Sequence, residues 1–436
     1  MSSIRGQSIS ESPIVSHPNA YINLPGFFRE KKASFGISLD DLSKHTILIG
    51  STGCGKTTLL FQYVQQILNR MSDKDIIIIF DSKGDYFNKF YNSHEDLVIG
   101  NSKKYRDKSV HWNMFKEIVD GLSKDDWEQI KQNASEICRS LFQDKVKNSN
   151  NHFFPNAARE LLETVLLLLL KNALEDQSIH LNNHYLYNFF KEHDMDGLRE
   201  FISLEDEYLS VLSYIGEEAE GQALGVYSEM NVAINELLTG VFCKENKGFS
   251  IRNFVRKKDK RILFIEYDIG LGNTLTPVYR LLLDFALKEA MSSNSDHKNN
   301  VYLICDEFRL LPELKHMDDA VNFGRSLGVK VIAGIQSVEQ IYDAYGKNHG
   351  NAILAGFSNM FLFRSNDWAT RQYISDLLGR TITMDLYKDY NNEYKPHIRE
   401  GHVAEDWDLM NLKIGQAIVC LPFEQPFLFQ FTDKGV

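Results

Sequence analysis

Long hydrophobic runs are absent from this sequence of 436 residues. The longest apolar stretch, 164–170, is bounded by Glu163 and Lys171, whereas a helix that crosses a bilayer needs about 20 apolar residues. The N-terminal segment also lacks the apolar region of a signal peptide. We therefore expect a cytoplasmic protein without a membrane-spanning segment.

Cysteine pairs and an excess of positive charge are absent as well. The five cysteines are scattered and form no C-x-x-C motif, which argues against a disulfide framework or a structural zinc site. The 48 Lys and Arg residues are outnumbered by 59 Asp and Glu residues, and the net charge is -11 at pH 7. A protein that coats nucleic acid is normally basic. Any contact with DNA must therefore be local, as in a ring-shaped motor with a few Lys and Arg residues in its channel.

Proline and glycine, with 9 and 27 residues, are too few for a disordered or fibrous chain, and 43% of the residues are hydrophobic. The length allows two or three globular domains. We expect residues 1–34 to form an N-terminal arm, because the first part of this segment is polar and aperiodic.

Apolar runs typical of buried strands alternate with helical segments over residues 35–115 and 247–436. This alternation predicts an α/β domain with an open, mainly parallel sheet. Over residues 116–246 helical periodicity takes over, which predicts an inserted all-α domain with a central, buried helix at 157–170. The expected strands span 46–49, 76–80, 262–266, 301–305, 329–335, 360–363 and 416–420, and the expected long helices span 123–143, 156–173 and 221–240.

A complete phosphate-binding loop lies between the first of these strands and a helix. The loop consists of Gly50, Ser51, Thr52, Gly53, Cys54, Gly55, Lys56, Thr57 and Thr58. Its glycines allow backbone N–H groups to wrap phosphates, Lys56 reaches the β- and γ-phosphates, and Thr57 holds Mg²⁺. The alternative is a glycine-rich turn at a helix start, but the flanking strand and helix favour a nucleotide site for ATP. Cys54 fills a position for a small residue rather than acting as a redox switch.

A P-loop protein needs a second strand that ends in a carboxylate, because Mg²⁺ must also be held from the side opposite the loop. The strand 301–305 is followed by Asp306 and Glu307. We expect Asp306 to hold Mg²⁺ through its water shell and Glu307 to polarise the attacking water. The two acids together favour a hydrolase over a kinase. The alternative is a pair of acids at an ordinary strand end.

The strand 329–335 ends at Gln336 and Ser337. A polar side chain at this position can contact the γ-phosphate or the attacking water and report hydrolysis to neighbouring elements. Gln336 is therefore a candidate sensor that acts with the catalytic residues. Ser337 precedes a helical run and is the better helix cap.

Several motifs, taken in order, resemble those of conjugative coupling ATPases of the TraD/TraG type, which are relatives of the FtsK and HerA DNA motors. The resemblance covers residues 35–430. The motifs are the loop 50–58, Asp81-Ser82-Lys83-Gly84-Asp85, Cys305-Asp306-Glu307-Phe308, Gly324-Arg325-Ser326-x-Gly328, Gly334-Ile335-Gln336-Ser337 and Phe363-Arg364-Ser365-Asn366-Asp367. The resemblance implies a RecA-like P-loop domain with an inserted all-α domain. It also implies a homohexameric ring that hydrolyses ATP between subunits and delivers DNA to a secretion channel.

Four further features carry positive charge. Arg325 matches the position of the family's arginine finger, which implies contact with the γ-phosphate of a neighbouring subunit, and a solvated Arg near a helix end is the alternative. Lys83 either contacts a phosphate or pairs with a neighbouring aspartate, and Arg364 is a candidate for a subunit interface. The basic run 252–261 is either a DNA path or, more commonly for such runs, a solvated loop.

Membrane-bound members of this family begin with transmembrane helices, which this sequence does not show. Either a membrane partner recruits the chain to the inner face of the membrane, or the protein is a soluble motor. The expected partners are DNA, single- or double-stranded, further copies of the chain, and a relaxase or secretion-channel protein. Two alternatives stand beside a coupling-type DNA translocase. One is a HerA-like motor that works with an effector in DNA processing or defence, and the other is a nucleotide-gated adaptor that docks protein cargo without translocation.

Overall fold

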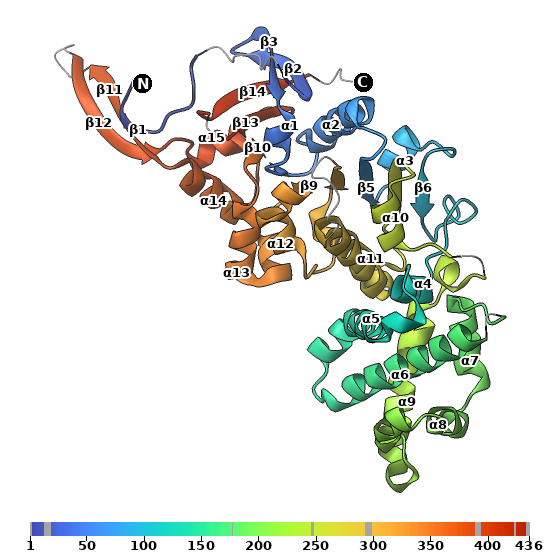
Figure 1. The fold of residues 1–436 in the computed structure, drawn as a ribbon. Helices are drawn as coiled ribbons and strands as arrows, with labels where there is room; N and C mark the ends of the chain where they lie inside the picture. Colours follow the sequence, from blue (N-terminus) through green and yellow to red (C-terminus); the bar gives the residue numbers. More distant parts are fainter. Residues whose placement is uncertain are drawn as a thin grey trace. The chain divides into compact units, whose positions relative to one another are not determined.

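Figure 1 shows the computed structural model of the chain. The structure describes residues 2–12, 19–176, 178–245, 248–292, 299–388, 394–422 and 424–432. The chain forms two compact units. The first consists of residues 1–81 and 294–436, and the second consists of residues 82–293.

The first unit is built on a parallel sheet. Its strands lie in the order β10 (Asn359–Phe363), β4 (Thr46–Ile49), β9 (Val329–Ile335), β8 (Val301–Cys305) and β5 (Ile76–Asp81), each parallel to its neighbour. Every residue of these strands is buried, as expected for a parallel sheet that is covered on both faces. The predicted α/β fold is therefore confirmed, and the predicted ends of β5 and β10 differ from the observed ones by one residue each.

The order of the three central strands positions the candidate site. β9 lies between β4, which leads into the predicted phosphate-binding loop, and β8, which leads into the two acids. All three strands are parallel, so their carboxyl ends meet at one edge of the sheet. The residues that follow these strands are consequently brought together, although they are far apart in the sequence.

Antiparallel strands extend this sheet beyond β10. They follow in the order β13 (Gln416–Cys420), β14 (Phe427–Phe431), β2 (Ile22–Phe28) and β3 (Lys31–Ile37). The arm expected at residues 1–34 therefore does not describe the segment from Ile22 onward, which the structure places in the sheet.

The pattern of β2 explains why the sequence did not indicate a strand there. Buried and exposed residues alternate along β2, as is typical of a strand with one covered face, but Pro25 and Gly26 interrupt the apolar pattern. Burial of the segment depends on distant aromatic side chains. The ring of Phe35 on β3, for example, lies 4.9 Å from the ring of Phe429 on β14.

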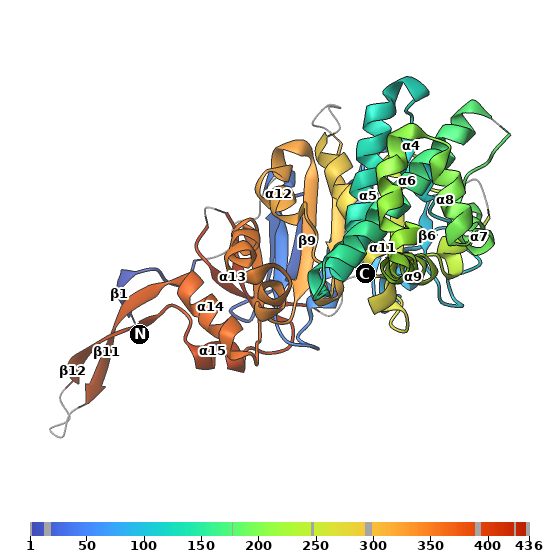
Figure 2. The ribbon, with the colours of Figure 1, turned by 90° about the horizontal axis from the view of Figure 1, so that it is seen from below.

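A second, smaller sheet belongs to the same unit. β1 (Ser2–Gly6), β11 (Arg380–Lys388) and β12 (Tyr394–His402) form an antiparallel sheet in which β11 is central. Figures 1 and 2 show this sheet extending away from α14 (Trp368–Leu378) and α15 (Asp406–Asn411). None of these strands was predicted, because few of their residues form apolar runs.

The remaining helices of the first unit include α2, which starts directly after the predicted phosphate-binding loop. Its buried residues include Leu59, Leu60, Val64 and Ile67, whose spacing is that of one helix face. These helices are α1 (Leu39–Leu42), α2 (Lys56–Arg70), α12 (Met317–Asn322) and α13 (Glu339–Ala355), with short 3-10 turns η5 (Phe308–Leu310) and η6 (Gly324–Leu327).

The second unit is mainly helical and contains one parallel pair of strands, β6 (Leu97–Ile99) and β7 (Ile262–Glu266). Its helices are α3 (Asp85–Phe90), α4 (Met114–Val119), α5 (Trp127–Asn148), α6 (Phe153–Glu175), α7 (Asn183–Glu192), α8 (Met195–Ser203), α9 (Glu220–Leu237), α10 (Ile251–Lys257) and α11 (Gly272–Ser292). Short 3-10 helices are η1 (Lys124–Asp126), η2 (Asp206–Tyr214), η3 (Glu217–Ala219) and η4 (Gly240–Cys243). The three long helices predicted for this region correspond to α5, α6 and α9, while the domain boundaries at residues 116 and 246 stay a prediction.

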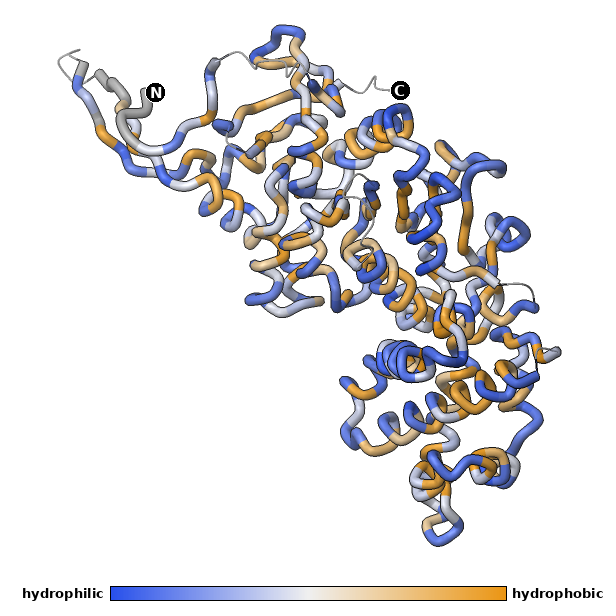
Figure 3. Tube along the Cα trace, in the orientation of Figure 1, coloured by the Kyte–Doolittle hydropathy of each residue, from blue (hydrophilic) through white to orange (hydrophobic). Residues whose placement is uncertain are grey.

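α6 is the central helix that its sequence predicts. All residues from Thr164 to Leu170 are buried, and Figure 3 shows a continuous hydrophobic stretch along this helix. A helix that is apolar on every side is typical of the middle of a helical bundle. Even so, within the described part of the chain no helix combines the length and the low charge that crossing a membrane requires.

Candidate functional site

The predicted phosphate-binding loop joins β4 to α2 and is held by the strands on both sides of β4. The N–H of Gly50 donates to the carbonyl oxygen of Ile335 on β9 at 3.1 Å. The N–H of Ser51 donates to the carbonyl oxygen of Arg364, directly after β10, at 2.8 Å. A Cβ at Gly50 would lie 2.6 Å from Cβ of Phe363, so that only glycine fits this approach.

The middle of the loop has the left-handed backbone that glycine adopts without strain. Gly53 has a φ of 75° and Gly55 a φ of 110°. A Cβ placed on Gly53 would meet no atom within 4 Å, so the loop is open at this point. Because α2 begins at Lys56, the free N–H groups of its first turn lie next to this open loop.

The ammonium group of Lys56 is held by the loop itself. Its Nζ donates to the carbonyl oxygens of Gly50 at 2.6 Å and Ser51 at 3.1 Å. Among the described residues, Lys56 forms no salt bridge with a carboxylate, so its charge remains available to an anionic ligand. Burial raises the pKa of the neighbouring Cys54 thiol, which favours an unreactive thiol.

The two predicted Mg²⁺ ligands are in direct contact. The hydroxyl of Thr57 donates to Oδ2 of Asp306 at 2.6 Å. Gly334 on the intervening strand β9 allows the backbone of Asp306 to lie close to β9, because a Cβ at this position would lie 2.5 Å from the carbonyl oxygen of Asp306. A hydroxyl and a carboxylate are oxygen ligands of the kind that Mg²⁺ prefers.

The candidate sensor lies against the candidate base. Nε2 of Gln336 donates to both carboxylate oxygens of Glu307, each at 2.9 Å. The backbone N–H of Gln336 donates to the side chain of Gln340 on α13 at 3.2 Å, which fixes the backbone at the end of β9. The amide and the carboxylate therefore form one connected group at the edge of the sheet.

The helix cap predicted at Ser337 lies one residue later. The cap position of α13 is Val338, and Ser337 Oγ accepts a hydrogen bond from the N–H of Glu339 at 3.1 Å. The hydroxyl of Ser337 also donates to Asp367 at 2.9 Å. Ser337 thus links the start of α13 to the loop after β10.

Two contacts of the phosphate-binding loop were not anticipated from the sequence. The N–H of Gly415, just before β13, donates to the carbonyl oxygen of Cys54 at 2.9 Å. The hydroxyl of Ser51 accepts a hydrogen bond from the N–H of Asn366 at 2.9 Å. Asn366 belongs to a motif of the family resemblance, whereas the sequence around Gly415 contains only an ordinary glycine turn.

Arg325 lies on η6, apart from the residues described so far. Its guanidinium group forms a salt bridge of 3.0 Å with Asp40 on α1, and both side chains are at least half exposed. The hydrogen bonds from Arg325 and Lys44 lower the pKa of Asp40. The structure therefore gives Arg325 an ion-pair partner within its own unit.

Arg364 and Lys83 are both exposed. The backbone of Arg364 supports the phosphate-binding loop, as described above. Within the described part of the second unit, Lys83 forms no salt bridge with Asp85, one of the partners that the sequence left open.

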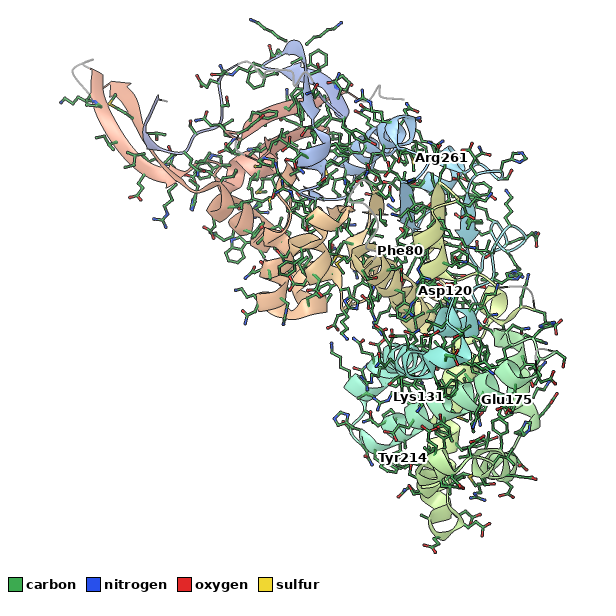
Figure 4. All side chains as sticks on the ribbon, viewed as in Figure 1. Phe80, Asp120, Lys131, Glu175, Tyr214 and Arg261 are labelled. Atoms are coloured by element: carbon green, nitrogen blue, oxygen red, sulfur yellow. The ribbon has the colours of Figure 1, made fainter. Side chains whose placement is uncertain are left out.

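The basic run 252–261 is only partly a loop, and its arginines form ion pairs. Its first six residues belong to α10, and its arginines pair with acids from other elements of the second unit. The pairs are Arg252 with Glu136 at 3.3 Å, Arg256 with Glu289 at 2.9 Å and with Asp120 at 3.2 Å, and Arg261 with Glu95 at 3.3 Å. Asp120 and Arg261 are labelled in Figure 4. This pairing argues against the run as a DNA path.

The family comparison agrees with this arrangement. Residues 31–401 match the model of the type IV secretion-system coupling protein DNA-binding domain. The chain belongs to this family. The predicted resemblance to conjugative coupling proteins is thereby confirmed.

Curated relatives are distant. The chain is 20% identical over 389 residues to the coupling protein TraD of Escherichia coli strain K12, a match that covers 86% of the chain and 49% of TraD. It is 20% identical over 287 residues to the type IV secretion system-coupling protein VirD4 of Bartonella henselae, covering 60% of the chain and 42% of VirD4. The chain thus spans about half the length of the curated relatives it matches.

Solved structures share the fold. The bacterial conjugative coupling protein TrwBdeltaN70 in its unbound form has a TM-score of 0.70 and 20% identity, with 94% of this chain and 88% of that chain covered. TrwB in complex with ADP and Mg²⁺ has a TM-score of 0.69 and 22% identity, with 92% and 87% covered. VirB4 of Thermoanaerobacter pseudethanolicus has a TM-score of 0.54 and 14% identity, with 97% and 98% covered. The predicted RecA-like P-loop fold with an all-α part is confirmed by this likeness.

Proposed function

We propose that the protein is an ATP-hydrolysing DNA translocase of the coupling-protein type. It acts as a homohexameric ring that delivers DNA or nucleoprotein to a secretion or transfer machinery. The observation that carries this proposal is the contact of Thr57 with Asp306 beside the contact of Gln336 with Glu307. One edge of the sheet thereby combines a phosphate-binding loop, a pair of metal-binding oxygens and a carboxylate base.

The residues fit a nucleoside triphosphate with Mg²⁺. The open loop at Gly53, the Lys56 ammonium without a carboxylate partner, and the paired oxygens of Thr57 and Asp306 match the phosphate groups and the ion. TrwB, a relative with the same fold, has been solved with ADP and Mg²⁺ and with a non-hydrolysable ATP analogue. Mg²⁺, when bound, supplies positive charge that offsets the negative charge of the phosphates.

The remaining roles follow from the chemistry of the side chains. Lys56 orients the phosphates, and Glu307 accepts a proton from the attacking water. Gln336, which donates to Glu307, orients that carboxylate and couples its state to α13 through Gln340. Hydrolysis of a nucleotide bound near Glu307 would therefore alter the hydrogen bonds of Gln336 and shift the backbone at the end of β9.

Arg325 serves as an arginine finger for a neighbouring subunit in this proposal. Its salt bridge with Asp40 holds the guanidinium at the surface, where a second copy of the chain can be reached. A guanidinium group supplied in trans stabilises charge in phosphoryl transfer and is worth roughly 10³-fold or more in rate.

Steady-state ATPase activity tests the proposal. Turnover should be measured without DNA, with single-stranded DNA and with duplex DNA, at two salt concentrations, while light scattering follows assembly. Stimulation by DNA that coincides with growth to a ring is expected, and Glu307→Gln should retain nucleotide binding but lose turnover. Hydrolysis that ignores DNA would instead favour the nucleotide-gated adaptor, and a stable stoichiometric complex with an effector would favour the HerA-like alternative.

The trans role of Arg325 has its own control. Arg325→Ala should abolish turnover in the assembled protein, whereas Asp40→Asn, which breaks the same salt bridge but keeps the guanidinium, should retain it. Normal turnover by assembled Arg325→Ala protein would show that this residue is not the finger. Equal loss in both variants would assign a structural role to the ion pair.

A further inference from the structure

The second unit carries an exposed group of cations on the segment that follows β6. This group, the basic loop, consists of Lys103, Lys104, Arg106 and Lys108, all of them exposed. With Asp107, the segment 101–109 has four positive charges and one negative, whereas the whole chain has a net charge of -11. Figure 3 shows a hydrophilic stretch beside β6.

The backbone of the basic loop is held in a defined conformation. The N–H groups of Tyr105 and Arg106 both donate to the carbonyl oxygen of Ser102 at 3.0 Å, and the N–H of Lys108 donates to that of Tyr105 at 2.9 Å. The N–H of Ser102 donates to the carboxylate of Glu266 on β7 at 3.0 Å. The loop is therefore a folded turn anchored to a strand.

Aromatic rings beneath the loop hold two of its ammonium groups. Nζ of Lys104 lies 5.4 Å from the ring centroid of Phe87 and 5.1 Å from that of Tyr105. Nζ of Lys108 lies 5.4 Å from the same Phe87 ring and 5.4 Å from that of Tyr91. Cation–π contacts orient these charges without neutralising them.

Carboxylates do not neutralise the basic loop. Across the described ranges of the second unit, none of its four cations forms a salt bridge with an acid. Arg106 uses Nε for a hydrogen bond to the carbonyl oxygen of Asn101 at 3.1 Å, and Lys104 donates to the carbonyl oxygen of Gly84 at 3.3 Å. These partners are uncharged, so the positive charge of the loop is directed to solvent.

We propose that the basic loop binds the phosphate backbone of the DNA on which the protein acts. This inference rests on the proposed function, since it assigns a DNA contact within the second unit. Several oriented cations without acidic partners match a polyanion that presents phosphates at a regular spacing. In a chain with excess negative charge, such a local surface is what a DNA contact requires.

The exposure of the rings beneath the basic loop predicts which part of the DNA the loop contacts. Phe87 is 6% exposed and Tyr105 is 4% exposed, so neither offers a face on which a base could stack. The ring of Tyr91 is stacked on that of Phe87, with the ring centroids 4.3 Å apart, and it lies beneath Lys108. The contact is therefore made to phosphates and carries no sequence information. Binding through this loop should depend steeply on salt and be the same for strands of different base composition.

The test compares two triple variants with the same change in net charge. Lys103→Gln, Lys104→Gln and Lys108→Gln alter the basic loop, while Lys124→Gln, Lys171→Gln and Lys191→Gln alter other lysines of the second unit. Fluorescence anisotropy with labelled single strands and duplexes, over a range of salt, gives the affinity and its salt slope. The loop variant should bind at least tenfold more weakly at low salt, with a slope reduced by about 2 for single strands and about 3 for duplexes, as expected for three lost phosphate contacts.

The outcomes separate the two proposals. If the wild-type protein neither binds DNA nor responds to it in ATP hydrolysis, the proposed function falls and the basic loop loses its assigned ligand. If the wild-type protein binds DNA and the loop variant binds like the control variant, only the basic loop assignment is wrong. Replacement of the same three lysines by arginine should keep DNA binding, which guards against a loss caused by misfolding.

Vesicles provide the competing polyanion. Binding to phosphatidylcholine vesicles with and without phosphatidylserine should be measured for the wild-type protein and the loop variant. We expect the substitutions to weaken DNA binding. If they abolish binding to anionic vesicles and leave DNA binding unchanged, the loop serves a membrane surface and the proposal is overturned.

Discussion

Two segments of the second unit are both rich in basic residues but have different surroundings. The run 252–261 contains arginines that are paired with acids, whereas the basic loop contains cations that lie over aromatic rings or face solvent. The pairs of the run are Arg252–Glu136, Arg256–Glu289 and Arg261–Glu95. Of the two segments, the one with the longer run of basic residues is thus the one that is less available to a ligand.

The difference teaches that charge density along the sequence does not determine which charges are available. Glu136, the partner of Arg252, is 116 residues away in the sequence and reaches it through the packing of α5 near α10. The rings beneath the basic loop come instead from Phe87 on α3, from Tyr91 directly after α3, and from Tyr105 in the loop itself. Arginines of the run therefore contribute to stability, and lysines of the loop are free to contribute to binding.

The largest expected effect is on the paired segment. The side chain of Arg252 is 9% exposed, and its guanidinium carbon lies 4.1 Å from the ring centroid of Phe285. Arg252→Ala removes a buried ion pair and this packing, and it should lower the free energy of unfolding by about 3 kcal/mol. A urea titration monitored by hydrogen exchange of the amides in α10 and α11 measures this loss.

Lys257→Ala is the matched control for that change, because Lys257 lies on the same helix, carries the same charge and is exposed. It should alter the free energy of unfolding by less than about 0.5 kcal/mol. Equal effects of the two substitutions would show that burial and pairing do not distinguish the residues of the run.

A buried acid next to the run makes the free energy of unfolding of this region depend on pH. Glu117 on α4 accepts hydrogen bonds from Trp112 Nε1 at 3.2 Å and from the N–H of Ile251, where α10 begins. Burial raises the pKa of Glu117 to about 7. The folded protein binds the proton of the Glu117 carboxyl more tightly than the unfolded chain does. The stabilisation that this proton gives to the folded state is complete below pH 4.5, the ordinary pKa of a glutamate, and it is lost as the pH rises through about 7.

The expected decrease in the free energy of unfolding is about 2 kcal/mol between pH 5 and pH 8. Chemical denaturation at a series of pH values measures it. Glu117→Gln cannot ionise but keeps the accepting oxygen, and its stability should vary less over this range. An unchanged pH dependence in that variant would exclude Glu117 as the source.

The parallel strands of the first unit could be predicted because their sequences allow few other structures. The residues of β4, β8 and β9 are mostly apolar, often β-branched, and buried on both faces. Once these strands are parallel, the acids after β8 and the amide after β9 must lie at the same edge as the phosphate-binding loop. The contact between Gln336 and Glu307 follows from this order of strands.

Other parts of the site depend on contacts that no local pattern encodes. The salt bridge of Arg325 with Asp40 joins residues that are 285 positions apart. The approach of Gly415 to Cys54 depends on the antiparallel strands β13 and β14, because the N–H of Phe431 at the end of β14 donates to the carbonyl oxygen of Gly415. The acids that neutralise the basic run belong to the same category, since each comes from a different element.

The smallest effect is expected from the basic loop. Replacement of Lys103, Lys104 and Lys108 by glutamine removes cation–π contacts worth roughly 0.5 kcal/mol each at exposed sites, but it also removes repulsion among like charges. These terms oppose each other, and the free energy of unfolding should change by less than about 0.5 kcal/mol. The same urea titration, monitored by hydrogen exchange in the second unit, measures this change. A loss as large as that of Arg252→Ala would mean that the loop lysines are structural, and the contrast between the two basic segments would then disappear.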